Sequence, residues 1–300
     1  MRQSRDAGAA GFHHGAYARR VAEPELTDQV RATWDGLAPA WERHRLQVFE
    51  GFRPVSEWLV ERVSPQPGQT ILEVAAGPGD TGFLAAQRLG DSGRLISTDL
   101  APGMVEAARR AASERGLGNV ECRVMDAQAL ELDDASVDGV LSRLGFMLMP
   151  DPAAAFREAR RVLRDGGRLA YAVIGSPPAN QWMGLMMMTL VQRGHAPAGD
   201  PFGPGGPFSL SDHERNRELL AEAGFDDVEV TELPGAMPFE NPGAYWDMQS
   251  QLSGPIPAMI ASLPPDEVAE IRETVETAVE QYAARGGYAL PSSLVTVVAH

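Results

Sequence analysis

The residues best suited to chemistry lie in one short segment, Glu73 to Gly82, whose sequence is E-V-A-A-G-P-G-D-T-G. It follows Ile71-Leu72 directly, and a glycine-rich turn behind a strand presents backbone N–H groups to a ligand at the start of the next helix. Gly77 to Gly82 matches G-x-G-x-x-G, which indicates a dinucleotide, but this is weak evidence in a chain with 31 glycines. Glu73 favours a cationic ligand, because an anionic pyrophosphate has no use for a carboxylate at that point.

Acids also end the next two predicted strands. Asp99 ends the second strand, where a carboxylate can accept from both hydroxyls of a ribose. Asp126 ends the third strand, before Ala127, where it can accept from an exocyclic adenine amine. Ligands of doubly wound sheets bind at the carboxyl ends of the strands, so we expect these acids and Ser142-Arg143, after the fourth strand, at one edge. The position of Asp99 fits a dinucleotide enzyme equally well, whereas Glu73 and Asp126 do not.

Seven strands and intervening helices are predicted to position these residues. The strands are expected at 70–75, 94–99, 120–125, 137–141, 168–173, 228–232 and 292–299. The helices are expected at 24–62 with a break near Pro54, and at 80–89, 102–115, 151–163, 211–223 and 265–284. Strands that alternate with helices of this length indicate an α/β fold with a doubly wound, mostly parallel sheet covered on both faces.

Five segments are expected along the chain. They are a flexible N-terminal arm (1–24), N-terminal helices that close over the ligand (25–64), the nucleotide-binding core (65–175), a Pro- and Gly-rich helical substrate cap (176–210), and the C-terminal part of the core (211–300) with a helical insertion at about 234–288.

Composition excludes several function classes. The net charge of −15 argues against a nucleic-acid partner. All 26 basic residues are Arg, which excludes a P-loop lysine and Schiff-base catalysis. Cys122 is the one cysteine, so an intramolecular disulfide or a thiolate zinc site is excluded, and we expect no metal. No apolar run approaches a membrane span, and the first residues lack an apolar segment, so we expect a cytoplasmic protein.

In several motifs the chain resembles the class I S-adenosylmethionine-dependent methyltransferases, particularly the ubiquinone/menaquinone C-methyltransferase-like (UbiE-like) group. Residues 71–79 resemble the family's E-x-G-x-G-x-G motif, 97–104 its acidic ribose-binding loop, and 125–127 its adenine site. Residues 138–144 resemble the fourth-strand motif, 158–171 the hallmark helix-turn-strand, and 34–42 a segment that closes over the cofactor. The resemblance implies a Rossmann-like fold.

The resemblance also implies S-adenosylmethionine as cofactor and S-adenosylhomocysteine as product. The residues it assigns to the cofactor are Trp41, Glu73, Ala75, Gly77, Pro78, Gly79, Asp99, Leu100, Met104, Asp126, Ala127, Ser142 and Arg143. One position departs from the family pattern, because Ala75 stands where the first glycine of the motif is usual.

Methyl transfer to an apolar or aromatic small molecule, on carbon or oxygen, is the activity this resemblance implies. Met-rich and aromatic positions are expected to line the acceptor pocket: Phe146, Met147, Trp182, Met186, Tyr245 and Trp246. Packing in the core is an equally good interpretation of the Met cluster. No catalytic residue is identified, but His44 and His195 are candidates for a general base.

Two other functions stay open. A nicotinamide-dependent oxidoreductase would use the same glycine turn, although the absence of lysine counts against its usual catalytic sets. A non-catalytic or repurposed protein of the same fold would keep the same cofactor-binding residues. The oligomeric state is open too, with a homodimer as one alternative.

Overall fold

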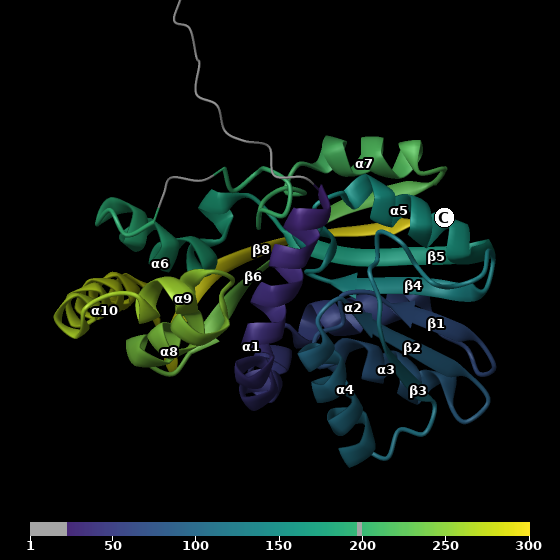
Figure 1. Cartoon of the computed structure of the whole chain (residues 1–300), viewed down its shortest axis with the longest axis horizontal. Coiled ribbons are helices and arrows are strands. Elements are labelled where there is room, and N and C mark those ends of the chain that lie inside the picture. Colours follow the sequence, from purple (N-terminus) through teal and green to yellow (C-terminus); the bar gives the residue numbers. More distant parts are fainter. Residues whose placement is uncertain (1–22, 197–199) are drawn as a thin grey trace, which may run out of the picture.

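The computed structural model describes residues 23–196 and 200–300 and centres on one mixed sheet (Figure 1). Its strands are β1 (Thr70–Glu73), β2 (Arg94–Asp99), β3 (Val120–Val124), β4 (Val137–Arg143), β5 (Leu163–Ile174), β6 (Val228–Phe239), β7 (Ala283–Ala284) and β8 (Gly287–Ala299). They lie in the order β3-β2-β1-β4-β5-β8-β6, with the short β7 paired to β8. Strands β1 to β5 pair in parallel, and β8 runs antiparallel to both β5 and β6.

Helices cover both faces of this sheet and form a separate cap at one end. They are α1 (Glu23–Gly51), α2 (Arg53–Val63), α3 (Asp80–Leu89), α4 (Pro102–Glu114), α5 (Pro152–Val162), α6 (Gln181–Gln192), α7 (His213–Glu222), α8 (Pro242–Leu252), α9 (Ile256–Ala261) and α10 (Pro265–Val279), with 3-10 turns at Phe146–Leu148, Pro177–Ala179 and Glu280–Tyr282. Helices α5 and α7 lie on one face of the sheet, and α2, α3 and α4 lie on the other (Figure 1). Helices α6, α8, α9 and α10 gather beyond the long strands β6 and β8, and these four helices are called the cap below. The doubly wound, mostly parallel α/β sheet predicted from the sequence is confirmed.

Local sequence explains where the helices begin. Helix α4 begins at Pro102, which has no N–H group to leave unpaired in the first turn. Helix α5 is capped by Asp151, whose carboxylate accepts from the N–H of Ala154 at 3.0 Å. Helix α7 is capped in the same way by Asp212, which accepts from the N–H groups of Glu214 and Arg215. The predicted starts of these helices were therefore close.

Several predicted boundaries were wrong. Strand β1 ends at Glu73 and not at Ala75, because Ala75 adopts a left-handed conformation with φ of +51°. Strand β6 continues through Pro234 and Pro238 to Phe239, and β8 begins at Gly287. Residues 240–286, between these strands, contain α8, α9, α10 and the short β7. The predicted arm lies almost entirely outside the described residues, as do 197–199 of the predicted cap.

Within the described part of the chain, none of the helices combines the length and the apolar character that crossing a membrane would require.

Candidate functional site

The glycine turn after β1 is built from residues with positive φ. Gly77 has φ of +56° and Gly79 of +84°. A side chain at Gly77 would meet nothing within 4 Å, so its backbone borders open space. A Cβ at Gly79 would lie 2.7 Å from the Phe83 ring, so that position needs glycine for packing as well as conformation. Pro78, between them, is buried. The turn thus leaves open space beside the partly buried backbone of Gly77, on a rigid base.

Ala75 has a structural counterpart across the sheet. A Cβ atom added at Gly145 would lie only 2.5 Å from the Cβ atom of Ala75. The absence of a side chain at Gly145 therefore makes room for the methyl group of Ala75, which stands where the motif usually has glycine. Leu144, next to Gly145, also has a positive φ, of +63°. Two non-glycine residues, Ala75 and Leu144, therefore adopt the left-handed conformation just after β1 and β4 end, which concentrates an energetic cost at the candidate site.

Glu73 lies inside the protein, with its side chain 1% exposed. Its Oε1 accepts from the N–H of Gly82 at 2.9 Å and its Oε2 from the Ser97 hydroxyl at 3.2 Å. Burial raises the pKa of the Glu73 carboxyl from 4.5 to about 8, against the opposing effect of these hydrogen bonds. Direct contact between Glu73 and a ligand cation stays a prediction, and its observed role is to tie β1 to α3 and β2.

Asp99 sits at the end of β2, opposite the glycine turn. Its Oδ2 accepts from the N–H of Gly77 at 2.8 Å, and its Oδ1 from that of Ala101 at 2.9 Å. Burial raises the pKa of the Asp99 carboxyl, while the hydrogen bonds from Ala101, Gly77 and Leu100 oppose the shift. Each carboxylate oxygen has a further lone pair, so Asp99 can still accept from a ligand hydroxyl.

Asp126 follows β3 and is partly buried. Its Oδ1 accepts from the backbone N–H of Gln128 at 2.9 Å, and the Gln128 side chain in turn accepts from the N–H of Asp151 at 2.7 Å. Ala127, beside it, is buried. These bonds hold the loop after β3 against the start of α5 and leave Asp126 at the same edge of the sheet as Asp99.

Helix α1 covers this edge and reaches the cap (Figure 1). Towards α4, Asp35 accepts from the N–H of Gly103 at 2.6 Å, and Glu42 binds Arg110 with two bonds of 2.6 and 2.8 Å. Towards the cap, the Trp41 indole N–H donates to the Leu252 carbonyl at 3.1 Å. Met104, 2% exposed, packs in a small cluster with partly buried Trp34 and Trp41. The segment expected to close over the cofactor thus contacts both α4 and the cap, and its closure over a bound cofactor stays a prediction.

Ser142 and Arg143, at the end of β4, have different surroundings. The Ser142 hydroxyl is fully buried and donates to the Val74 carbonyl at 2.9 Å, so it joins β4 to β1. The Arg143 guanidinium stacks over the Phe52 ring at 5.1 Å from its centroid. Its Nε and Nη1 atoms are buried without a hydrogen-bond partner.

The sequence reasoning did not single out Asp80 and Arg45. Asp80, in the first turn of α3, is 4% exposed and pairs with Arg45 at 3.0 Å and with Arg115. Burial raises the pKa of the Asp80 carboxyl despite both cations. The sequence did contain a signal for Arg45, because it follows Trp41 by four residues and so lies on the same face of the helix predicted to close over the cofactor.

The six residues predicted to line an acceptor pocket are all at most 5% exposed. On the sheet side, Phe146 stacks on Phe156 with ring centroids 4.6 Å apart, and Met147 accepts from the N–H of Ile174 at 3.3 Å. In the cap, the Tyr245 hydroxyl accepts from the N–H of Met186 at 3.3 Å. Trp182 packs edge-on against Phe52, which lies between α1 and α2, and Trp246 lies beside Arg272. They pack as core residues here, and contact with an acceptor stays a prediction.

The two histidine candidates lie in different places. His44, on α1, has its Nε2 3.1 Å from the side-chain oxygen of Gln251 on α8. His195, just after α6, pairs with Glu267 of α10 at 2.7 Å. Only His44 belongs to the helix that covers the strand ends, so it is the better placed of the two.

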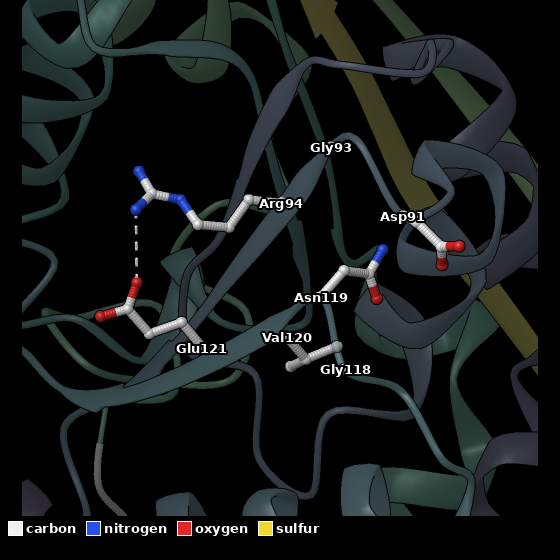
Figure 2. Close-up of a pocket in the computed structure, with 7 residues that line it drawn as sticks. All are labelled: Asp91, Gly93, Arg94, Gly118, Asn119, Val120 and Glu121. Atoms are coloured by element: carbon white, nitrogen blue, oxygen red, sulfur yellow. Dashed lines mark ion pairs between the residues drawn. The ribbon is translucent and has the colours of Figure 1, made fainter.

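Two open hollows lie elsewhere. One, of about 490 Å³, lies where β2 and β3 begin, beside the ion pair of Arg94 and Glu121 at 3.5 Å (Figure 2). The other, of about 610 Å³, lies between the start of α8 and α10. Neither contains a predicted cofactor residue, and the first is at the edge opposite the one that binds ligands in this kind of sheet. Among the described residues, no cluster of His, Cys, Asp and Glu is arranged to hold a metal ion.

Comparison with known sequences gives a consistent result. Residues 71–167 match a family model described as a methyltransferase domain. The chain is 34% identical over 212 residues to nocamycin O-methyltransferase of Saccharothrix syringae, which covers 65% of this chain and 72% of that protein. It is also 34% identical over 156 residues to aklanonic acid methyltransferase of Streptomyces sp. strain C5, which covers 52% of this chain and 66% of that protein.

Comparison with solved structures supports the same fold. The YcgJ protein of Bacillus subtilis superposes with a TM-score of 0.55 at 17% identity, over 81% of this chain and 96% of its own.

Proposed function

The chain belongs to the class I S-adenosylmethionine-dependent methyltransferases, and on that premise we propose that it methylates an apolar or aromatic small molecule on carbon or oxygen. The acceptor class is suggested by the names of the two relatives, which act on nocamycin and aklanonic acid. Membership of the narrower UbiE-like group, a cytoplasmic location and a homodimeric state stay predictions.

The observation that carries this proposal is the arrangement of Gly77 and Asp99 beneath α1. The open backbone at Gly77 and the partly free carboxylate of Asp99 fit a ligand with an adenosine and an amino-acid tail. Asp99 would hold the ribose hydroxyls, Asp126 the adenine amine, and Met104 would pack near the base. Trp41 would close the site from above.

When bound, S-adenosylmethionine supplies a methyl group already activated by the sulfonium. The protein therefore has to hold the acceptor's nucleophilic atom about 3 Å from that carbon, in line with the C–S bond, and to exclude water. Helix α1 would serve the second requirement, because it packs on α4 at the end of β2 and also reaches α8. A base is needed only if the acceptor must lose a proton, and His44 is the residue we assign to that step.

A ligand screen tests the cofactor class. S-adenosylmethionine and S-adenosylhomocysteine should each raise the midpoint of thermal unfolding, whereas NADP⁺ should not. Stabilisation by NADP⁺ alone would overturn the proposal in favour of an oxidoreductase.

Mutation then tests the site. Asp99→Asn should weaken S-adenosylmethionine binding at least tenfold, about 1.4 kcal/mol, because the amide cannot accept as strongly from the ribose hydroxyls. Glu121→Gln, at the opposite end of β3, is the matched control and should leave the affinity unchanged. Tight binding by the wild-type protein with no methyl transfer to any of a broad panel of quinones, phenols and carboxylic acids would favour the non-catalytic alternative.

A further inference from the structure

Arg143 is a partly buried cation at the candidate site. Its Nε and Nη1 atoms are buried without a hydrogen bond. Among residues 23–196 and 200–300, no carboxylate comes within ion-pair distance of it, and its guanidinium lies over the Phe52 ring. Burial lowers the pKa of Arg143 to about 10, so the guanidinium keeps its charge at neutral pH. Buried guanidinium nitrogens without a hydrogen-bond partner are costly, and such groups call for an explanation.

The acids nearest to Arg143 are already engaged. Both oxygens of Glu73 accept hydrogen bonds, one from Gly82 and one from Ser97. Asp80 is shared between two other arginines, Arg45 and Arg115. These carboxylates act on Arg143 only at a distance, so its forked donor group has no acceptor within the described protein.

The backbone holds Arg143 firmly at the ligand-binding edge. The residue before it, Ser142, is bonded to Val74 of β1 at 2.9 Å. The residue after it, Leu144, donates its N–H to the Ala172 carbonyl at 2.8 Å and adopts the costly left-handed conformation. Arg143 therefore stands between the ends of β1 and β4, where the strand order reverses and where ligands of such sheets bind.

We propose that Arg143 binds a carboxylate group of a ligand at this point, through the two-pronged hydrogen bonding that guanidinium and carboxylate groups form. This inference rests on the proposed function and deepens it. The carboxylate has two possible sources, the amino-acid tail of S-adenosylmethionine or an acidic acceptor. A protein with a net charge of −15 needs a local cation to bind either anion, and Arg143 supplies an unpaired one.

Paired ligands with and without the carboxylate provide the test. Calorimetry would give the dissociation constants of S-adenosylmethionine and decarboxylated S-adenosylmethionine. In the presence of S-adenosylhomocysteine, it would give those of anthraquinone-2-carboxylate and anthraquinone-2-carboxamide. Arg143→Met should weaken one carboxylate ligand at least tenfold and its neutral counterpart less than twofold, and the affected pair identifies the source. Arg143→Lys should recover part of the loss, and Arg168→Gln, an exposed arginine on β5, should change neither pair.

Stability provides a second readout, which separates ligand binding from a structural role. Without ligand, Arg143→Met should unfold at the same or a higher temperature than the wild type, because it removes two buried nitrogen atoms that have no hydrogen-bond partner. A lower unfolding temperature, or equal effects on the acidic and neutral ligands, would overturn the inference. If the wild type failed to bind S-adenosylmethionine at all, the proposed function itself would fail, which is a different result from an unchanged Arg143 variant.

Discussion

Glu73→Gln is the perturbation whose effect can be worked most directly from the structure. The Glu73 carboxyl has a pKa of about 8 in the folded protein and about 4.5 when exposed in the unfolded chain. The folded state thus holds this proton more tightly than the unfolded state does. Stability is therefore greatest below pH 4.5 and falls as the pH rises from 4.5 to 8. Above pH 8 the loss amounts to about 5 kcal/mol, and at pH 7 to about 3 kcal/mol.

Glutamine reproduces the shape of the protonated carboxyl and cannot ionise. Its oxygen can accept from the N–H of Gly82 as Glu73 does, and its amide can donate to the Ser97 hydroxyl. The two proteins should therefore be equally stable near pH 4.5. The variant should become more stable by about 3 kcal/mol at pH 7 and by about 5 kcal/mol above pH 8.

Urea unfolding of both proteins between pH 5 and 9 would measure this difference. Glu42→Gln is a control of opposite sign, because the hydrogen bond from Arg110 lowers the pKa of Glu42. Its stabilising effect is lost only as the pH falls through the folded pKa, so that difference should be constant across pH 5 to 9. Parallel curves for Glu73→Gln and wild type, or a variant that loses stability as the pH rises, would refute the argument from burial.

Three further predictions concern the turn, the covering helix and the cysteine. Ala75→Gly should raise the free energy of unfolding by about 0.5 kcal/mol, because glycine relieves the strain of a positive φ at this position. The control Ala76→Gly, at a position without a positive φ, should lower the free energy of unfolding by a similar amount. Urea unfolding measures both changes. Trp41→Phe removes the hydrogen bond to the Leu252 carbonyl, which is worth about 1 kcal/mol, and should therefore speed cofactor release about fivefold. Stopped-flow binding measures the release rate, and equal rates for variant and wild type would contradict the prediction. Burial raises the pKa of the Cys122 thiol to about 11. A thiol-reactive chromophore should therefore label the native protein at least 100-fold more slowly than the urea-unfolded chain. Comparable labelling rates would mean that this part of β3 opens readily.

Much of the core could be predicted from sequence because its signals are local. The alternation of strands and helices from Thr70 to Ile174 shows in apolar runs, proline starts and glycine turns, which depend on neighbours along the chain. The extent of β6 could not be predicted in this way. Pro234 and Pro238 argue against a strand, yet β6 is an edge strand paired only to β8, where a residue without an N–H group is tolerated.

The candidate site shows the same division. The positions of Gly77 and Asp99 followed from motif spacing, and the structure brings them into hydrogen-bond contact. The expected acceptor residues illustrate what spacing leaves undecided, since an apolar position such as Met186 has the same sequence pattern in a core as in a pocket. Nor does any sequence pattern reveal that Arg143 lacks a partner, because that depends on how Glu73 and Asp80 are used by groups distant in the chain.

The double attachment of helix α1 has a kinetic consequence. The helix meets α4 through charged pairs such as Glu42–Arg110 but meets the cap through neutral hydrogen bonds such as Trp41–Leu252. Added salt screens the first kind of contact and hardly affects the second. At high ionic strength the helix is expected to detach first from α4 while staying with the cap, so cofactor exchange should speed up with salt. Detachment of α1 from α4 would then control both the release of product and the entry of the next cofactor. Turnover would therefore depend on ionic strength even for an uncharged acceptor.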